Sequence, residues 1–236
     1  MNSDKIANMY DLGAEIEIGC EDAIVNGILQ VPEQRQGLVL FAHGSGSSRW
    51  SPRNQYVARV LRDAGFATLL FDLLTREEEV EDQRTGRLRF DIELLARRLS
   101  GATRWCAGQK SLAGMRVGYF GASTGAAAAL MAAAGAPELV AAIVSRGGRP
   151  DLAGAALAIV RAPTLLIVGG NDGPVMQLNR EALDRLRIAE KQLVIVPGAS
   201  HLFEERGALE SVAGIARQWF LRYLPAAPHV WMPAAG

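Results

Sequence analysis

The chain has 236 residues, of which 49% are hydrophobic, and its 25 Lys and Arg residues equal its 25 Asp and Glu residues in number. This length and composition are typical of one globular domain with a substantial core. Neither a basic tract nor a basic stripe interleaved with aromatic residues is present, which argues against a nucleic-acid partner. The N-terminus lacks the basic start and apolar core of a secretory signal, so we expect a cytoplasmic protein without membrane contact.

Two early segments predict an antiparallel hairpin. Residues 14–18 and 23–31 alternate in polarity or are rich in β-branched side chains, and a turn at residues 20–22 separates them. We expect this hairpin to form one edge of a sheet.

After the hairpin, short apolar runs alternate with amphipathic helical segments, which is typical of successive βα units. The expected strands cover residues 37–42, 67–71, 116–120, 139–144, 163–168 and 192–196. The expected helices cover residues 52–64, 90–107, 175–187 and 209–223, with another that starts near residue 124. This order predicts an α/β fold with a mostly parallel sheet and helices on both faces. We expect a single domain over residues 1–236, with a core from about residue 14 to 223.

Three further segments need separate comment. Residues 126–144 are apolar enough to suggest a membrane span, but Gly135, Pro137 and Glu138 interrupt them, so a helix, a turn and a strand are expected. The charged segment at residues 75–84 is interpreted as a solvated loop, with a mobile lid over residues 75–88 as the alternative. No insertion is long enough for a cap domain. The proline-rich tail, residues 225–236, is expected to follow the surface or fray.

The two cysteines carry no recognisable metal or disulfide pattern. Cys20 and Cys106 are far apart in the sequence and have no C-x-x-C spacing. We expect free thiols, no metal and no cofactor.

The segment Gly121-Ala-Ser-Thr-Gly125 has the G-x-S-x-G pattern of a nucleophile elbow. It follows the predicted strand at residues 116–120 and opens an Ala-rich helix. An elbow requires small residues two positions before and after the serine, because the neighbouring strand and helix approach closely there. Ser123 is therefore the candidate nucleophile.

A serine hydroxyl needs a general base to accept its proton. The chain offers three histidines. His201 directly follows the last predicted strand, at the sheet edge where the elbow is expected, whereas His43 belongs to a Gly-rich loop and His229 to the tail. We therefore assign His201 as the base, with a purely structural histidine as the alternative.

A carboxylate should hold the base in the correct tautomer. Asp172 lies just after the strand at residues 163–168 and gives the chain order Ser, Asp, His that is expected of α/β-hydrolases. An aspartate that only stabilises a turn is the alternative interpretation. Asp151 and the pair Glu204-Glu205 are weaker candidates.

The oxyanion of the tetrahedral intermediate needs preorganised N–H donors. The backbone amide of Thr124 at the start of the helix is one candidate, and the amide of Ser45 in the loop His43-Gly-Ser-Gly46 is the other. His43 is expected to shape this loop by hydrogen bonding. A Gly-rich connector without a catalytic role is the alternative, and the absence of G-x-G-x-x-G and Walker patterns argues against nucleotide binding.

Together these segments resemble lidless α/β-hydrolases of the dienelactone hydrolase type. The resemblance extends from about residue 14 to residue 223, and its motifs are His43-Gly-Ser45, Gly121-Ala-Ser-Thr-Gly125, Gly170-Asn-Asp172 and Gly198-Ala-Ser-His201. It implies a Ser123, Asp172 and His201 triad with an oxyanion hole at Ser45 and Thr124, and cofactor-free hydrolysis of carboxylic esters, lactones or thioesters. Dienelactone hydrolases have a cysteine at the elbow, so the serine favours a general carboxylesterase.

We therefore predict a serine esterase that cleaves small to medium esters through an acyl-enzyme. The alternatives are a thioesterase, a lactone or dienelactone hydrolase, a peptidase or acyltransferase, and a catalytically silent ligand-binding module. The sole expected partner is a small-molecule ester, and the oligomeric state is not predicted.

The residues that could contact the substrate lie in the loops of the predicted crevice. Candidates are Gly44, Trp50, Leu74, Arg146, Arg149 and Phe203. Either arginine could hold an acidic group of the substrate. Structural pairing of these arginines with Asp72 or Asp151 is the favoured alternative.

Overall fold

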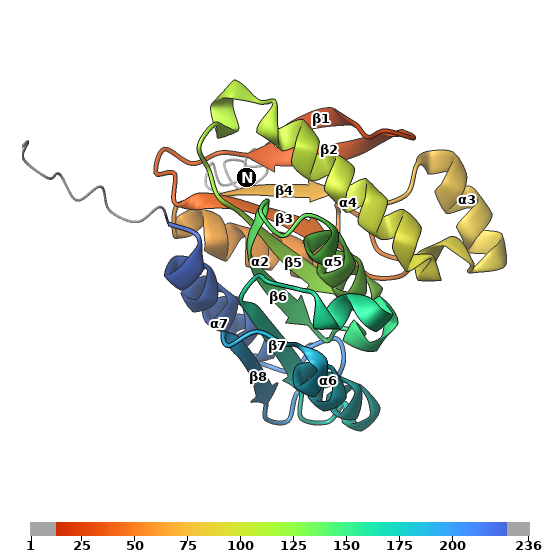
Figure 1. Cartoon of the computed structure of the whole chain (residues 1–236), viewed down its shortest axis with the longest axis vertical. Coiled ribbons are helices and arrows are strands. Elements are labelled where there is room, and N and C mark those ends of the chain that lie inside the picture. Colours follow the sequence, from red (N-terminus) through yellow and green to blue (C-terminus); the bar gives the residue numbers. More distant parts are fainter. Residues whose placement is uncertain (1–12, 226–236) are drawn as a thin grey trace, which may run out of the picture.

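The structure is a computed structural model that describes residues 13–225. It contains an eight-stranded sheet in the order β1-β2-β4-β3-β5-β6-β7-β8 (Figure 1). The pairs β1–β2 and β2–β4 are antiparallel, and the other pairs are parallel. The predicted hairpin and the mostly parallel sheet are confirmed. The tail prediction concerns residues that, from 226 onward, lie outside the described part.

The strands lie close to their predicted positions. Their bounds are β1 (Ala14–Gly19), β2 (Ile24–Gln30), β3 (Gly37–Ala42), β4 (Phe66–Phe71), β5 (Val117–Ala122), β6 (Val140–Arg146), β7 (Thr164–Gly169) and β8 (Lys191–Val196). The inner strands are buried on both faces, which explains their continuous apolar sequences. In β3, for example, Leu38 and Leu40 belong to one core cluster while Val39 and Phe41 belong to the other.

Helices cover both faces of the sheet, as predicted. The helices are α2 (Pro52–Asp63), α4 (Ile92–Ala107), α5 (Thr124–Gly135), α6 (Gly173–Arg185) and α7 (Ala208–Tyr223). Apolar side chains of α2 and α7 pack together on one face, and those of α4, α5 and α6 pack on the other. None of the helices within residues 13–225 combines the length and apolar character needed to cross a membrane.

The charged segment after β4 is a helix, so the prediction of a loop was wrong. Helix α3 (Arg76–Thr85) begins at a capping box in which Thr75 and Glu78 bond each other's backbone amides. Arg98, buried on α4, donates two 2.8 Å bonds to the Glu78 carboxylate. These bonds anchor α3 beyond the carboxyl end of β4 (Figure 1).

Short 3₁₀ segments precede α4 at Leu88–Phe90 and β5 at Lys110–Leu112, and a third, Pro150–Ala158, follows β6. The sequence did not predict them. The strand order reverses at β3, because β4 lies on one side of it and β5 on the other. In open α/β sheets, ligands bind at the carboxyl ends of strands beside such a reversal.

Candidate active site

Ser123 lies in a strained turn between β5 and α5. Its φ of 51° and ψ of −122° are unusual for a residue with a side chain. The flanking glycines permit the turn: a Cβ on Gly121 would lie 2.5 Å from the Ala126 Cα, and one on Gly125 would lie 2.1 Å from the Ala42 oxygen. The glycines predicted to be necessary at this turn are thus in close contact with the neighbouring backbone.

The loop after β6 fixes the backbone of this turn. The Ser123 amide donates to the Arg146 carbonyl at 3.3 Å, and the Arg149 amide donates to the Ser123 carbonyl at 3.0 Å. These bonds involve the main chain of both arginines and leave their side chains free for other contacts. The conformation of Ser123 is therefore held from outside the elbow itself.

His201 and Asp172 lie in the loops after the last two strands, and Nδ1 of His201 is 2.6 Å from Oδ2 of Asp172. With Nδ1 donating to the carboxylate, Nε2 carries a lone pair that can accept a proton. Asn171 connects the two loops, because its side chain donates to the Gly198 carbonyl at 2.8 Å and its amide to the Ala199 carbonyl at 2.9 Å. Sequence reasoning missed this role of Asn171, although the residue adjoins Asp172.

Ser123 and His201 line one cavity of about 210 Å³. The cavity is lined by Gly44, Ser45, Ser47, Ser51, Arg53, Ala122, Ser123, Arg146, Gly147, His201 and Leu202. The Ser123 hydroxyl and His201 form no mutual hydrogen bond here; such bonds are often long without substrate and tighten in the complex. The structure thus brings together Ser123, His201 and Asp172, three residues from three loops.

His43 orients the peptide between Gly44 and Ser45. Its Nδ1 lies 3.0 Å from the Gly44 carbonyl, and its Nε2 accepts the Leu73 amide at 3.0 Å, so the ring is neutral with Nδ1 protonated. Burial lowers the pKa of His43, which favours this neutral form. In a trans peptide the N–H points opposite to the carbonyl. The Ser45 amide is therefore directed away from His43.

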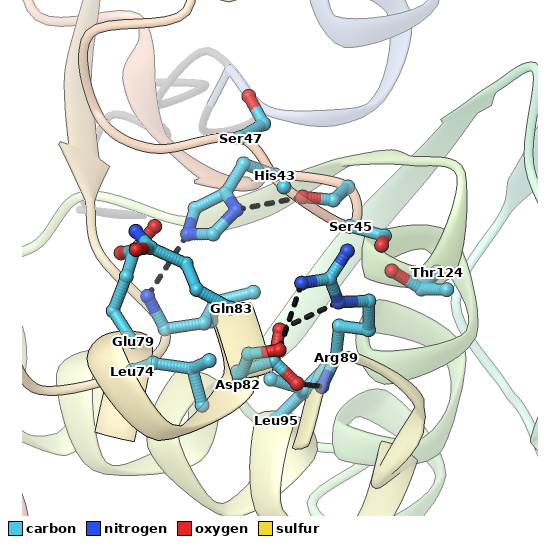
Figure 2. A pocket seen from close by; sticks show the side chains of 13 residues that line it. His43, Ser45, Ser47, Leu74, Glu79, Asp82, Gln83, Arg89, Leu95 and Thr124 are labelled. Atoms are coloured by element: carbon cyan, nitrogen blue, oxygen red, sulfur yellow. Dashed lines mark hydrogen bonds and ion pairs between the residues drawn. The ribbon is translucent and has the colours of Figure 1, made fainter. Parts of the chain in front are cut away.

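A second cavity of about 120 Å³ adjoins the first and shares Gly44, Ser45 and Ser47 with it. Figure 2 shows His43 and the side chains of α3 on one side of this cavity and Ser45 with Thr124 on the other. Arg89 donates to the buried Asp82 at 2.6 Å, so the positive charge of Arg89 and the negative charge of Asp82 compensate each other in the lining. Thr124 begins α5, so its amide has no acceptor within the helix.

The arginines that follow β6 have different environments. Arg149 donates to both carboxylate oxygens of Asp151, at 2.9 and 2.8 Å, so its predicted structural pairing is confirmed. Asp72 pairs instead with Arg49. Arg146 is buried, with 7% of its surface exposed, and no carboxylate among residues 13–225 pairs with it. The expectation of a structural partner was therefore wrong for Arg146.

Two further predicted substrate contacts, Trp50 and Phe203, line neither of the two cavities. Trp50 is 43% exposed, and the Arg49 guanidinium lies 4.9 Å from its ring centroid. Phe203 is buried in the core, and the Arg146 guanidinium lies 5.9 Å from its ring centroid. Leu74 lines the second cavity. Of the predicted contacts, Gly44 and Arg146 line the cavity of Ser123.

The weaker candidates for the carboxylate that holds the base form interactions with other residues. Asp151 binds Arg149, Glu204 forms a 3.2 Å ion pair with Arg53, and Glu205 accepts the Ser200 amide at 3.0 Å. Arg53 lines the cavity from the first turn of α2, a position that sequence reasoning did not single out. It lies eight residues after Ser45, in the helix that follows the predicted oxyanion loop.

Both cysteines are free thiols, as predicted. Burial raises the pKa of Cys106 to about 12, and it also raises that of Cys20. Neither lines the cavity of Ser123. Within residues 13–225, no group of three or more His, Cys, Asp or Glu side chains is arranged to hold a metal ion.

The sheet order and the elbow after its fifth strand define an α/β-hydrolase fold. Est1E from Butyrivibrio proteoclasticus has the same fold, with a TM-score of 0.74 at 15% identity over 89% of this chain and 98% of that one. The sequence matches the dienelactone hydrolase family over residues 25–222, and the chain belongs to that family.

Two groups of relatives are much more similar in sequence. A crystal structure described as a dienelactone hydrolase from Anabaena variabilis ATCC 29413 is 58% identical, with a TM-score of 0.87, over 90% of this chain and 99% of that one. Two Mycobacterium tuberculosis proteins, each named "Putative phosphoribosyl transferase", are 58% identical over 210 residues. That match covers 89% of this chain and 46% of each relative, so the chain spans about half of their length.

Proposed function

We propose that the protein is a serine hydrolase that cleaves small to medium carboxylic esters through an acyl-enzyme. The observation that carries the proposal is the strained Ser123 in one cavity with His201, whose ring is held by Asp172 at 2.6 Å. Strain of this kind persists where the surrounding structure enforces it, and it clusters at active sites. A binding module without catalysis would not need this arrangement.

In the proposed reaction, Ser123 Oγ attacks the ester carbonyl while its proton passes to Nε2 of His201. Asp172 stabilises the resulting imidazolium through the Nδ1–H bond. The amides of Ser45 and Thr124 are the proposed donors to the oxyanion. As the tetrahedral intermediate collapses, the alkoxide leaves with the proton from His201 and the acyl group stays on Ser123. Water then gives a proton to His201 and attacks the acyl carbonyl. The second tetrahedral intermediate collapses as Ser123 Oγ leaves with the proton from His201, which releases the carboxylic acid and restores the enzyme.

The size of the cavity supports a modest substrate. Its volume of about 210 Å³ lies below the range of roughly 300–1,000 Å³ that is typical of drug-sized ligands. A long acyl chain would extend beyond it into solvent. Short-chain esters therefore fit the site better than long-chain lipids do.

The name of the mycobacterial relatives does not change the activity that we propose for this chain. Those proteins are more than twice as long as the matched segment, and the matched segment belongs to a hydrolase family. Transfer of an acyl group to water and its transfer to another acceptor share the same first half-reaction at a serine. Thioesters and lactones would react at Ser123 by the same steps.

The proposal is tested with a fluorophosphonate probe, which phosphonylates activated serines. We expect labelling of the native chain, a mass increase mapped to Ser123, and no labelling of the Ser123→Ala variant. A Ser47→Ala variant is a matched control, because Ser47 lines the same cavity outside the elbow. Native, folded protein that does not react, or that reacts equally after Ser123→Ala, contradicts the proposal.

A further inference from the structure

Arg146 presents a charge to the cavity of Ser123 that nothing in the described chain neutralises. Its Nε is buried without a hydrogen-bond partner, and its guanidinium has no carboxylate partner among residues 13–225. Burial, with a contribution from nearby Arg53, lowers the pKa of Arg146 to about 10, so the group is still a cation at neutral pH. Removing a charge from water without a partner is costly, and buried arginines are normally paired. Arg146 therefore lacks a counter-ion that its environment requires.

The contact with Phe203 does not replace that counter-ion. The guanidinium lies 5.9 Å from the ring centroid, close to the limit of about 6 Å for a cation–π interaction. Such a contact also leaves the in-plane N–H donors unused. Those donors form the fork that binds carboxylates and phosphates bidentately.

Other groups around the cavity also favour an anion. Arg53 lines it with a second guanidinium, whose Nε is buried without a partner and whose Nη1 is 3.2 Å from Glu204 at the exposed rim. Ser47 and Ser51 line the same cavity, and Ser51 caps α2, a helix of 12 residues. The positive end of that helix adds to the attraction for negative charge.

The position of Arg146 relates this charge to the scissile bond. Ala122 and Arg146 are paired across β5 and β6, so Arg146 lies beside the residue that precedes Ser123. Neighbouring strands are about 4.8 Å apart, and Arg146 and Ser123 both line the cavity of about 210 Å³, so a group held by Arg146 would share that small cavity with a carbonyl at Ser123. The anion would thus be part of the same molecule as the ester.

We infer that Arg146, assisted by Arg53, is an anion-binding subsite next to Ser123, and that the preferred ester carries a carboxylate or a phosphate group a few bonds from the scissile carbonyl. The inference rests on the proposed ester hydrolysis and names its substrate class. Arg146 is a specificity-determining residue in this scheme and takes no part in proton transfer.

The test compares kcat/KM for matched aryl esters that differ in one charged group. The acyl series is phenyl butyrate, the phenyl half-ester of succinate and phenyl 3-phosphonopropionate; the alcohol series is the acetates of phenol, 3-hydroxybenzoate and 3-hydroxyphenyl phosphate. We expect an anionic member of one series to exceed its neutral counterpart by at least about tenfold. The better of the carboxylate and phosphorus members identifies the natural anion.

Arg146→Gln should lower the ratio of anionic to neutral kcat/KM by about 10- to 100-fold, the usual effect of losing a hydrogen bond to a charged group. Arg146→Lys should restore part of the ratio, because it keeps the charge. Arg149→Gln is the matched control, because Arg149 lies in the same loop but its side chain binds Asp151. This substitution should leave the ratio unchanged. A wild-type protein without anionic preference, or a ratio that Arg146→Gln leaves unchanged while both rates fall, overturns the inference.

A binding measurement separates this inference from the proposed function. Ser123→Ala protein is titrated calorimetrically with inorganic phosphate, succinate and uncharged succinamide. We expect one of the two anions to bind, succinamide not to bind, and Ser123→Ala/Arg146→Gln to lose the binding at unchanged thermal stability. If no ester is cleaved but this pattern holds, the hydrolase proposal fails while the anion site stands; if neither anion binds, the anion site fails.

Discussion

Replacing His43 with alanine tests the connection between the proposed oxyanion loop, residues 43–46, and the segment that follows β4. In the native structure, Nε2 accepts the buried Leu73 amide at 3.0 Å, and Nδ1 bonds the Gly44 carbonyl at 3.0 Å. Alanine leaves the Leu73 amide without a partner, which costs about 1–3 kcal/mol. The Gly44 carbonyl still accepts the Ser47 amide at 3.2 Å, so loss of its bond to His43 costs about 0.5–1.5 kcal/mol of stability. The sum is a destabilisation of roughly 1.5–4.5 kcal/mol.

The same variant should change how stability depends on pH. Because Nε2 must accept a hydrogen bond, the folded protein holds His43 neutral, and burial lowers its pKa below the ordinary value of about 6.5. The carboxylates of Asp72 and Glu79 oppose this shift without cancelling it. As the pH falls below about 6.5, the unfolded chain binds a proton first, so the native state loses up to about 1.4 kcal/mol per pH unit until the lowered pKa is reached. Above pH 6.5 this group contributes no slope.

Urea unfolding followed by circular dichroism between pH 5 and 8 measures the loss of stability and its dependence on pH. The kcat on an aryl acetate measures the effect on catalysis. A displaced Ser45 amide should lower kcat by up to about 10²–10³. His201→Ala is the matched control, since that ring is 39% exposed: it should abolish turnover at a small cost in stability. A His43→Ala variant within 1 kcal/mol of wild type, or with a parallel pH profile below 6.5, would refute the reasoning.

Three other substitutions test the remaining contacts. Asp172→Asn should lower kcat on an aryl ester by about 10³–10⁴ with little change in KM, because the amide no longer fixes the tautomer of the base; a loss below tenfold contradicts the assignment. Gly125→Ala places a Cβ 2.1 Å from a backbone oxygen and should abolish soluble expression or lower the urea midpoint sharply, whereas Gly135→Ala, with open space around it, should be neutral or slightly stabilising. Arg98→Met removes the ion pairs to Glu78 and Asp22, whose side chains are 26% and 41% exposed, and should destabilise the protein by about 1–3 kcal/mol in urea unfolding, with early proteolytic cleavage in α3; an unchanged midpoint argues against this anchor.

Most of the sheet follows from the sequence because buried parallel strands require continuous apolar runs, and each run here lies between turn residues. The loops after these strands could also be predicted to meet, since the carboxyl ends of parallel strands share one edge. That reasoning anticipated the bond between His201 and Asp172 at 2.6 Å without locating either side chain.

What the sequence did not indicate depends on tertiary pairing. The segment at residues 75–84 has a single apolar residue, Val80, so apolar periodicity could not reveal a helix there. The capping pattern Thr75-Arg-Glu-Glu78 was a local signal for its start, but the bond from Arg98 on α4 comes from a distant part of the chain. Likewise, the missing partner of Arg146 is visible in three dimensions alone, because Asp72 and Asp151 were both plausible by sequence.

The most direct test of the central claim is the intact mass of the protein at intervals after mixing with a slowly turned-over aryl ester. We predict a burst of phenol equal to the protein concentration and a transient mass increase of one acyl group, mapped to Ser123 and absent from Ser123→Ala. Hydrolysis of the ester at an unchanged rate by Ser123→Ala protein would contradict the account.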